Sequence, residues 1–125
     1  MKDERIVIVE AKRTAIGSFQ GKLSNTSAPI LGAETIKHIL KNTKISPEEI
    51  DETIIGCVLP AGIGQAPARQ TSIFAGIPDK VGATTINKMC GSGMKSTMIA
   101  YDSIKAGSNK IVISGGIENM SSAPY

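Results

Sequence analysis

Cys90 is the residue whose surroundings best suit covalent chemistry. It lies in the stretch INKMCGSGMKS (86–96), after an apolar, strand-like run and before Gly91, Ser92 and Gly93, where helical spacing begins. In open α/β folds, reactive groups gather at the carboxyl ends of strands, where the following helices present their N-termini. A helix N-terminus offers unpaired N–H groups and a partial positive charge, which favour a thiolate over a thiol. Cys90 is therefore a candidate nucleophile.

The flanking residues separate Cys90 from the second cysteine. Gly91 and Gly93 remove side chains beside the sulfur, so a substrate can approach it and free N–H groups can point at it. A cysteine without such a setting is usually a small buried apolar residue, and Cys57, within the apolar run TIIGCVL (53–59), fits that interpretation. His38 falls on the polar side of a predicted helix, and we interpret it as a surface residue.

Nucleotide-binding motifs do not explain this glycine-rich turn. The letters GSGMKS lack the Gly-Lys pair of a phosphate-binding P-loop, and they also lack the third glycine of a dinucleotide fingerprint.

Composition and charge argue against several other function classes. The chain has 125 residues, enough for one small domain, and its net charge of +3 is spread without a basic block, which gives no support for nucleic-acid binding. The sequence contains no apolar run of membrane-spanning length and no secretory signal. One histidine and two cysteines without CxxC spacing do not make a metal site. We expect a cytoplasmic protein with no membrane partner and no metal.

Apolar strands alternate with amphipathic helices along the chain. Short β-branched runs predict strands at residues 5–11, 53–59, 82–89 and 110–118. Helical spacing and capping residues predict helices from about residue 28 to 40, at 46–50, at 66–75 and at 91–106. In the last of these helices, Met94, Met98, Tyr101 and Ile104 line one face. The order predicts an α/β fold with a mostly parallel sheet and helices on both faces.

The stretch INKMCGSGMKS closely resembles the nucleophile motif of the thiolases, which join or cleave acyl-CoA chains by Claisen chemistry. Four further segments resemble thiolase segments in the family's order and spacing: RTAIGSFQGKLS (13–24), SAPILGAE (27–34), GCVLPAGIGQAPARQ (56–70) and SGGIENMSSAPY (114–125). The resemblance covers essentially the whole chain. It implies a thiolase-like fold, with residues 1–125 as the first part of its N-terminal domain and with the loop domain and the C-terminal domain absent.

The resemblance also implies specific roles. Cys90 would take the acyl group from acyl-CoA as a thioester, and its backbone N–H would contribute to an oxyanion hole. The strand at 82–89 resembles the one that thiolases use for their dimer interface, so a homo-oligomer is implied. Gln65 and Arg69 lie near that interface in the family and are expected to be structural, and residues 114–125 are expected to shape the active site. No cofactor or metal is implied, because acetyl-CoA and CoA are substrates.

Small departures from the family pattern leave the nucleophile unchanged. Ala15 stands where proline is common, Cys57 where asparagine is common, and Ile117 and Asn119 vary the usual GGMES pattern. The large departure is length. By the resemblance, the missing part holds the activating histidine, a second cysteine, the asparagine of the oxyanion hole and most of the CoA-binding surface. We expect the chain alone to be incomplete as an enzyme and to expose an unfinished sheet edge.

Three interpretations follow from the sequence. The first is an acetyl-CoA acetyltransferase-type thiolase of fatty acid metabolism that converts two acetyl-CoA to acetoacetyl-CoA and back, with the remaining sequence supplied in cis or by a C-terminal thiolase polypeptide. The second is an inactive fragment that only associates with other subunits. The third is a ketoacyl-synthase-type condensing enzyme, against which the letters GQAPARQ and NKMCGSG argue.

Overall fold

A computed structural model describes residues 5–125 of the chain. Its elements, in chain order, are α1 (Ala28–Thr43), the short 3-10 helix η1 (Pro47–Glu49), β1 (Glu52–Gly56), α2 (Pro67–Phe74), β2 (Gly82–Ile86), α3 (Ser92–Lys105) and β3 (Val112–Gly116). All four predicted helices and three of the four predicted strands are confirmed, although the strands are shorter than predicted. Among the described residues, no helix is both long and apolar enough to cross a membrane.

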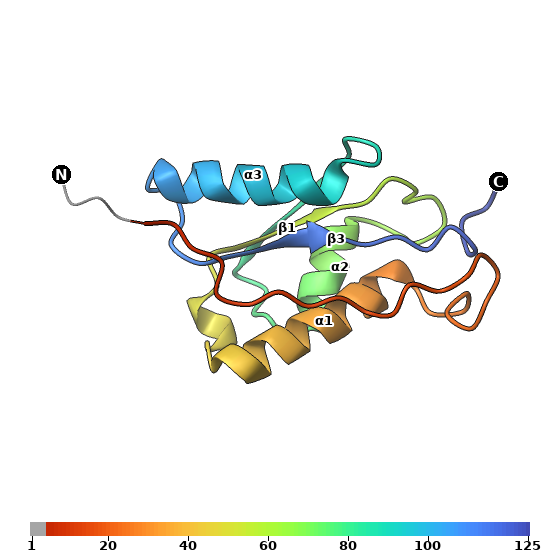
Figure 1. Cartoon of the computed structure of the whole chain (residues 1–125), viewed down its shortest axis with the longest axis horizontal. Coiled ribbons are helices and arrows are strands. Elements are labelled where there is room, and N and C mark those ends of the chain that lie inside the picture. The colour runs from red at the N-terminus through yellow and green to blue at the C-terminus, as the bar shows by residue number, and fades with distance from the viewer. Residues whose placement is uncertain (1–4) are drawn as a thin grey trace.

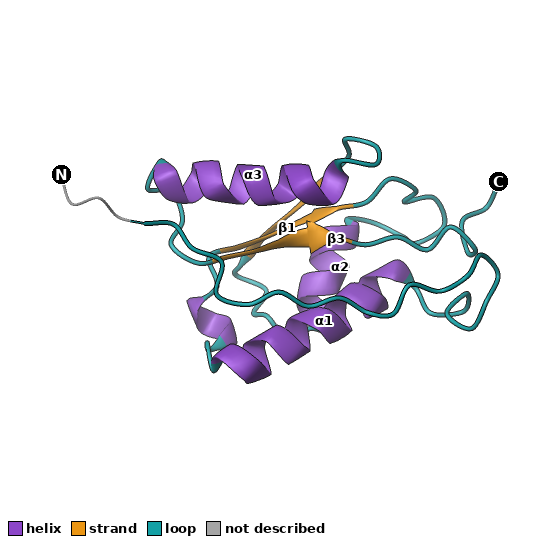
Figure 2. Ribbon diagram, viewed as in Figure 1, coloured by secondary structure: helices purple, strands orange, loops and turns teal. Residues whose placement is uncertain are grey.

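The three strands form one parallel sheet in the order β2-β1-β3. Glu52 of β1 lies opposite Gly82 on one side and Val112 on the other. α3 covers one face of the sheet, whereas α1 and α2 cover the opposite face (Figure 1). This arrangement confirms the predicted parallel sheet with helices on both faces. The loops after the three strands emerge at one end of the sheet (Figure 2). In open parallel sheets, functional groups gather at this end.

The prediction of a buried strand at residues 5–11 is wrong. This segment has no regular secondary structure, and Val7, Ile8 and Val9 are 67%, 77% and 68% exposed. A strand needs a hydrogen-bonded neighbour, and within residues 5–125 the sheet ends at β3 without pairing this run. A groove of about 720 Å³ separates residues 5–14 from β3 and from the adjoining faces of α1 and α3. The run is apolar as the sequence indicates, but no strand within residues 5–125 pairs with it.

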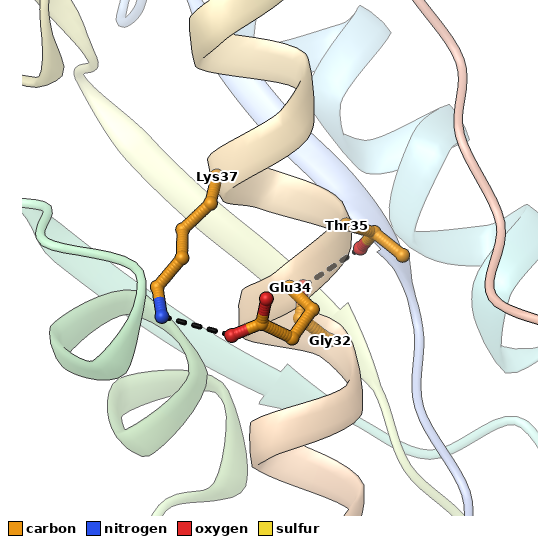
Figure 3. Close-up of polar contacts among 4 residues, drawn as sticks. All are labelled: Gly32, Glu34, Thr35 and Lys37. Carbon is orange, nitrogen blue, oxygen red and sulfur yellow. Dashed lines mark hydrogen bonds and ion pairs between the residues drawn. The ribbon is translucent and has the colours of Figure 1, made fainter.

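α1 packs closely against α2 at Gly32. A side chain at this position would place its Cβ 2.6 Å from Ile117 Cγ2 and 2.9 Å from Thr71 Cγ2, so only glycine allows the approach. The Thr35 hydroxyl donates to the Gly32 carbonyl at 2.7 Å, and an exposed ion pair joins Lys37 to a carboxylate one turn earlier (Figure 3). The inner face of α1 contributes to the larger core cluster, formed by Ala33, Ile36, Leu40, Ile50, Ala75, Ile77, Val81 and Ile113.

α3 turns its small residues, not its large apolar ones, toward the sheet. Its buried residues are Ser92, Ser96 and Ala100, and the Ser96 hydroxyl donates to the Gly115 carbonyl of β3 at 2.8 Å. The face predicted from Met94, Met98 and Tyr101 exists, but these three side chains are exposed. Small residues on α3 and glycines at the strand ends let the helix lie close to the sheet, and this closeness positions the turn before the helix.

Candidate active site

Cys90 lies at the junction of β2 and α3, as the sequence predicts. β2 ends at Ile86, α3 begins at Ser92, and Gly91 occupies the position before the first helical residue. The Cys90 side chain is exposed. The structure therefore places this sulfur at the carboxyl end of the sheet, beside a helix N-terminus and open to a ligand.

A shallow cavity of about 260 Å³ opens beside Cys90. It is lined by residues from the ends of β1 and β3 and from the turn before α3, namely Gly56, Val58, Met89, Cys90, Ser92, Gly93, Gly116, Ile117 and Glu118. Gly116, Ile117 and Glu118 belong to this lining, so the segment 114–125 contributes to the shape of the cavity, as expected. Glycines at three of the nine lining positions leave room for a small acyl group.

Side chains on both sides of Cys90 hold its turn in an uncommon backbone conformation. Met89 has φ 48°, a left-handed value that is rare for residues other than glycine. The Ser92 hydroxyl donates to the Met89 carbonyl at 2.5 Å and accepts the Lys88 N–H at 2.8 Å. On the other side, Asn87 Oδ1 accepts the Met89 N–H at 2.9 Å. Such a strained residue persists only where its surroundings determine its conformation.

The carboxylate of Glu118, which follows the edge strand β3, holds the loop after β1 in place beside the cavity. Glu118 accepts the N–H of Val58 through Oε2 and the N–H of Leu59 through Oε1, both at 3.0 Å. The amide of Asn87 donates to the Val58 carbonyl at 3.3 Å. These bonds tie the loop after β1 to the turn of Cys90 and to the segment after β3, so the cavity wall is fixed from two sides.

The two cysteines have different environments, as the sequence predicts. Cys57 is 1% exposed, and its Sγ lies 3.7 Å from Glu118 Oε1. Burial, followed by the negative charge of Glu118, raises the pKa of the Cys57 thiol to about 11. Because this thiol is both buried and protonated near neutral pH, only Cys90 among the two is placed to act as a nucleophile.

Three other residues singled out from the sequence are not among the residues that line this cavity. Arg69 donates to the carbonyls of Val81 at 2.7 Å and Asp79 at 3.2 Å, which supports the structural role expected for it. The Gln65 carbonyl accepts a side-chain N–H of Gln70 at 2.7 Å within the same loop. His38 is exposed on α1 and is not among the residues that line the cavity.

Sequence reasoning missed the contributions of Glu118 and Asn87. The two glycines that end β3 indicate that Glu118 lies at the carboxyl end of a strand. Its hydrogen-bond partners, however, are about sixty positions away in the sequence. Asn87 directly follows β2. Within residues 5–125, no group of three or more His, Cys, Asp or Glu side chains is close enough to hold a metal ion.

Fold and site together define an α/β protein with an accessible cysteine at a helix start, and comparison with known proteins assigns its family. The family model described as "Thiolase, N-terminal domain" matches residues 6–125. The chain belongs to the thiolase family.

Curated relatives are about half identical to this chain over the residues that match. An acetyl-CoA acetyltransferase from Cupriavidus necator is 53% identical over 120 residues, which cover 96% of this chain and 30% of the relative. An acetyl-CoA acetyltransferase from Allochromatium vinosum is 51% identical over 123 residues, covering 98% of this chain and 31% of the relative. A "Probable acetyl-CoA acyltransferase" from Staphylococcus aureus is 52% identical over 120 residues, covering 96% of this chain and 30% of the relative. The chain thus spans about 30% of the length of these relatives.

Proposed function

We propose that the chain is the nucleophile-bearing part of an acetyl-CoA acetyltransferase. In the acylation step, the Cys90 sulfur forms a bond to the acetyl carbonyl carbon, and the carbonyl π electrons move to the oxygen. When the tetrahedral intermediate collapses, the bond between that carbon and the CoA sulfur breaks, and CoA leaves with the thiol proton. The acetyl-cysteine then reacts with a second acetyl-CoA in condensation, and thiolysis runs in the reverse direction.

The observation that carries this proposal is the exposed Cys90 at the start of α3, beside a cavity lined by glycines. Within the part of the chain that the structure describes, its backbone N–H makes no hydrogen bond to another backbone or side-chain group. An N–H group that is free and held in place can stabilise the oxyanion of the intermediate. We take acetyl-CoA as the acyl donor because the relatives are named acetyl-CoA acetyltransferases.

We place the groups that move protons outside this chain. The cavity lining contains no histidine, and the second cysteine, Cys57, is buried and protonated. The relatives are about three times longer than the part matched here. We place the base, the second thiol and most of the CoA site in that additional sequence, supplied in cis or by a C-terminal thiolase polypeptide.

The same proposal assigns partners to the open edges of the sheet. The groove between residues 5–14 and β3 has the apolar lining expected of a sheet that continues, and we place a strand of the additional sequence there. The free edge of β2 is proposed to pair with a second copy in a homo-oligomer. The protein is proposed to act in the cytoplasm, in fatty acid metabolism.

The function is tested by placing residues 6–125 into the C. necator relative instead of its own matching segment. We expect the chimera to cleave acetoacetyl-CoA in the presence of CoA. The Cys90→Ser variant should lose at least three orders of magnitude in kcat, because a hydroxyl is a far weaker nucleophile than a thiolate. The matched variant Cys57→Ser should retain activity. A folded chimera that turns over equally well with and without Cys90 refutes the proposal, and a folded but inactive chimera favours a fragment that only associates.

A further inference from the structure

Two side chains, those of Ser92 and Asn87, hydrogen-bond to Met89, the residue before Cys90. We propose that these two side chains are positioning residues that aim the Cys90 backbone N–H at the acyl oxygen. The inference rests on the proposed function, in which that N–H stabilises the oxyanion. It assigns a task to two residues that do not touch the reacting carbon.

The Cys90 N–H belongs to the peptide group between Met89 and Cys90. A trans peptide is planar, so its C=O and its N–H point in opposite directions and turn as one unit. Two donors hold the Met89 carbonyl oxygen: the Ser92 N–H at 3.0 Å and the Ser92 hydroxyl at 2.5 Å. By fixing this oxygen, Ser92 fixes the direction of the Cys90 N–H on the other side of the same peptide plane.

Ser92 can hold that oxygen because Ser92 is itself buried, hydrogen-bonded and closely packed. Its side chain is almost fully buried, and its hydroxyl also accepts the Lys88 N–H at 2.8 Å. The Ser92 backbone and Cβ press against Gly56 of β1, where an added Cβ would lie only 2.6 Å from both the Ser92 C and Cβ atoms. One donated and one accepted bond use the hydroxyl proton and one lone pair, which leaves a single orientation of the group.

Asn87 acts on the other side of Met89. Its Oδ1 accepts the Met89 N–H at 2.9 Å, while its amide group donates to the Val58 carbonyl at 3.3 Å. Met89 has φ 48°, a conformation that costs on the order of 1–3 kcal/mol for a residue other than glycine. Asn87 and Ser92 bond to opposite ends of this residue and offset that cost. Without them, Met89 is expected to relax and the Cys90 N–H to turn.

The two roles of the turn, presenting the sulfur and aiming the N–H, are separable by choice of reagent. With iodoacetamide, the Cys90 sulfur forms a bond to the methylene carbon and iodide leaves, so no oxyanion develops. With p-nitrophenyl acetate, the sulfur adds to a carbonyl carbon, and the intermediate oxyanion collapses with loss of p-nitrophenolate, the thiol proton passing to solvent. Both reactions depend equally on the thiolate fraction. The ratio of the two rate constants therefore reports the oxyanion donor alone.

The experiment measures this ratio at Cys90 of the 125-residue chain by peptide mass analysis. Ser92→Ala should lower the ratio of acylation to alkylation roughly tenfold to a hundredfold, since losing a whole oxyanion donor costs about 10²–10³ in rate. Ser96→Ala is the matched control, because Ser96 is also a buried serine of α3 but its hydroxyl bonds to the Gly93 and Gly115 carbonyls. Protection of Cys57 from iodoacetamide shows that each variant is folded.

The Asn87 variants provide a second test if Ser92→Ala fails to fold. Asn87→Ala should lower the ratio, whereas Asn87→Asp, which keeps an acceptor for the Met89 N–H, should restore most of it. A wild-type ratio in Ser92→Ala or Asn87→Ala, an equal fall in Ser96→Ala, or no acylation of Cys90 in the wild-type chain overturns the inference. The proposed function fails separately, when the folded chimera turns over equally well without Cys90.

Discussion

Glu118, which follows β3, accepts the N–H of Leu59, which follows β1, at 3.0 Å across 59 positions of sequence. The second oxygen of the same carboxylate accepts the adjacent Val58 N–H. A bidentate, charge-assisted contact of this kind holds two loops in one register. The wall of the Cys90 cavity is therefore built by residues that are distant in the sequence.

Replacing Glu118 should loosen that wall. Glu118→Ala leaves the N–H groups of Val58 and Leu59 without their partner, and we expect the free energy of unfolding to fall by about 1–3 kcal/mol. Urea unfolding followed by circular dichroism measures the change. Glu34→Ala is the control, because Glu34 is exposed and its ion pair with Lys37 should be worth less than about 1 kcal/mol. Equal losses in the two variants would contradict the role of Glu118.

Gly56 should tolerate no side chain. Gly56→Ala would place a Cβ 2.6 Å from the Ser92 C and Cβ atoms, so α3 must shift or the chain must lose stability, by about 1–3 kcal/mol. Gly115→Ala is the matched control in the neighbouring strand, since a Cβ there meets nothing within 4 Å. Thermal unfolding of the two variants should separate them clearly. If Gly115→Ala proves the more damaging, the close packing of α3 on β1 is wrong.

Only one of the two thiols should react in the folded chain. Cys90 is exposed and Cys57 is buried, so iodoacetamide at neutral pH should add one group to the native protein and two groups after denaturation. The Cys90→Ser variant should remain unmodified until it is unfolded. Modification of Cys57 at the rate of Cys90 would show that the loop after β1 opens readily.

The buried thiol of Cys57 should make the protein sensitive to alkali. Its pKa is raised from 9.0 to about 11 in the folded state, so below pH 9 the thiol is protonated in both states and adds no pH dependence. Between pH 9 and 11 the unfolded thiol loses its proton while the folded one keeps it, so stability falls as pH rises. Cys57→Ala should show a smaller fall over this range in urea unfolding. Parallel curves for the two proteins would refute the shift.

Local patterns predicted the elements of this fold, and long-range contacts explain what they missed. Cap signals and helical spacing were enough for α1 and α3, because helix formation depends on nearby residues. The apolar run at 5–11 predicts a strand, yet whether such a run pairs depends on a neighbouring strand that the run itself does not specify. Likewise, the spacing of Met94 and Met98 showed a shared face of α3 but not which way it points.

The same distinction holds for the site. Cys90 was found from its glycine-rich neighbours, since the strand-to-helix turn is a local feature. Glu118 has partners about sixty positions away, so no local pattern indicates its role, whereas the bond between Asn87 and Met89 spans only two positions. Asn119, noted only as a departure from the family pattern, donates to the carbonyls of Ser24 at 3.0 Å and Thr26 at 2.7 Å, some 95 positions earlier. No local spacing contains such a pairing.

The most direct test of the central claim is to locate the acetyl group after reaction with acetyl-CoA. The chimera that carries residues 6–125 is incubated with acetyl-CoA, quenched in acid and digested, and the peptides are weighed. We predict one acetyl group on the peptide that contains Cys90, lost on addition of CoA and absent from the Cys90→Ser variant. An acetyl group that persists in that variant, or that resides on Cys57, would contradict the assignment of Cys90 as the nucleophile.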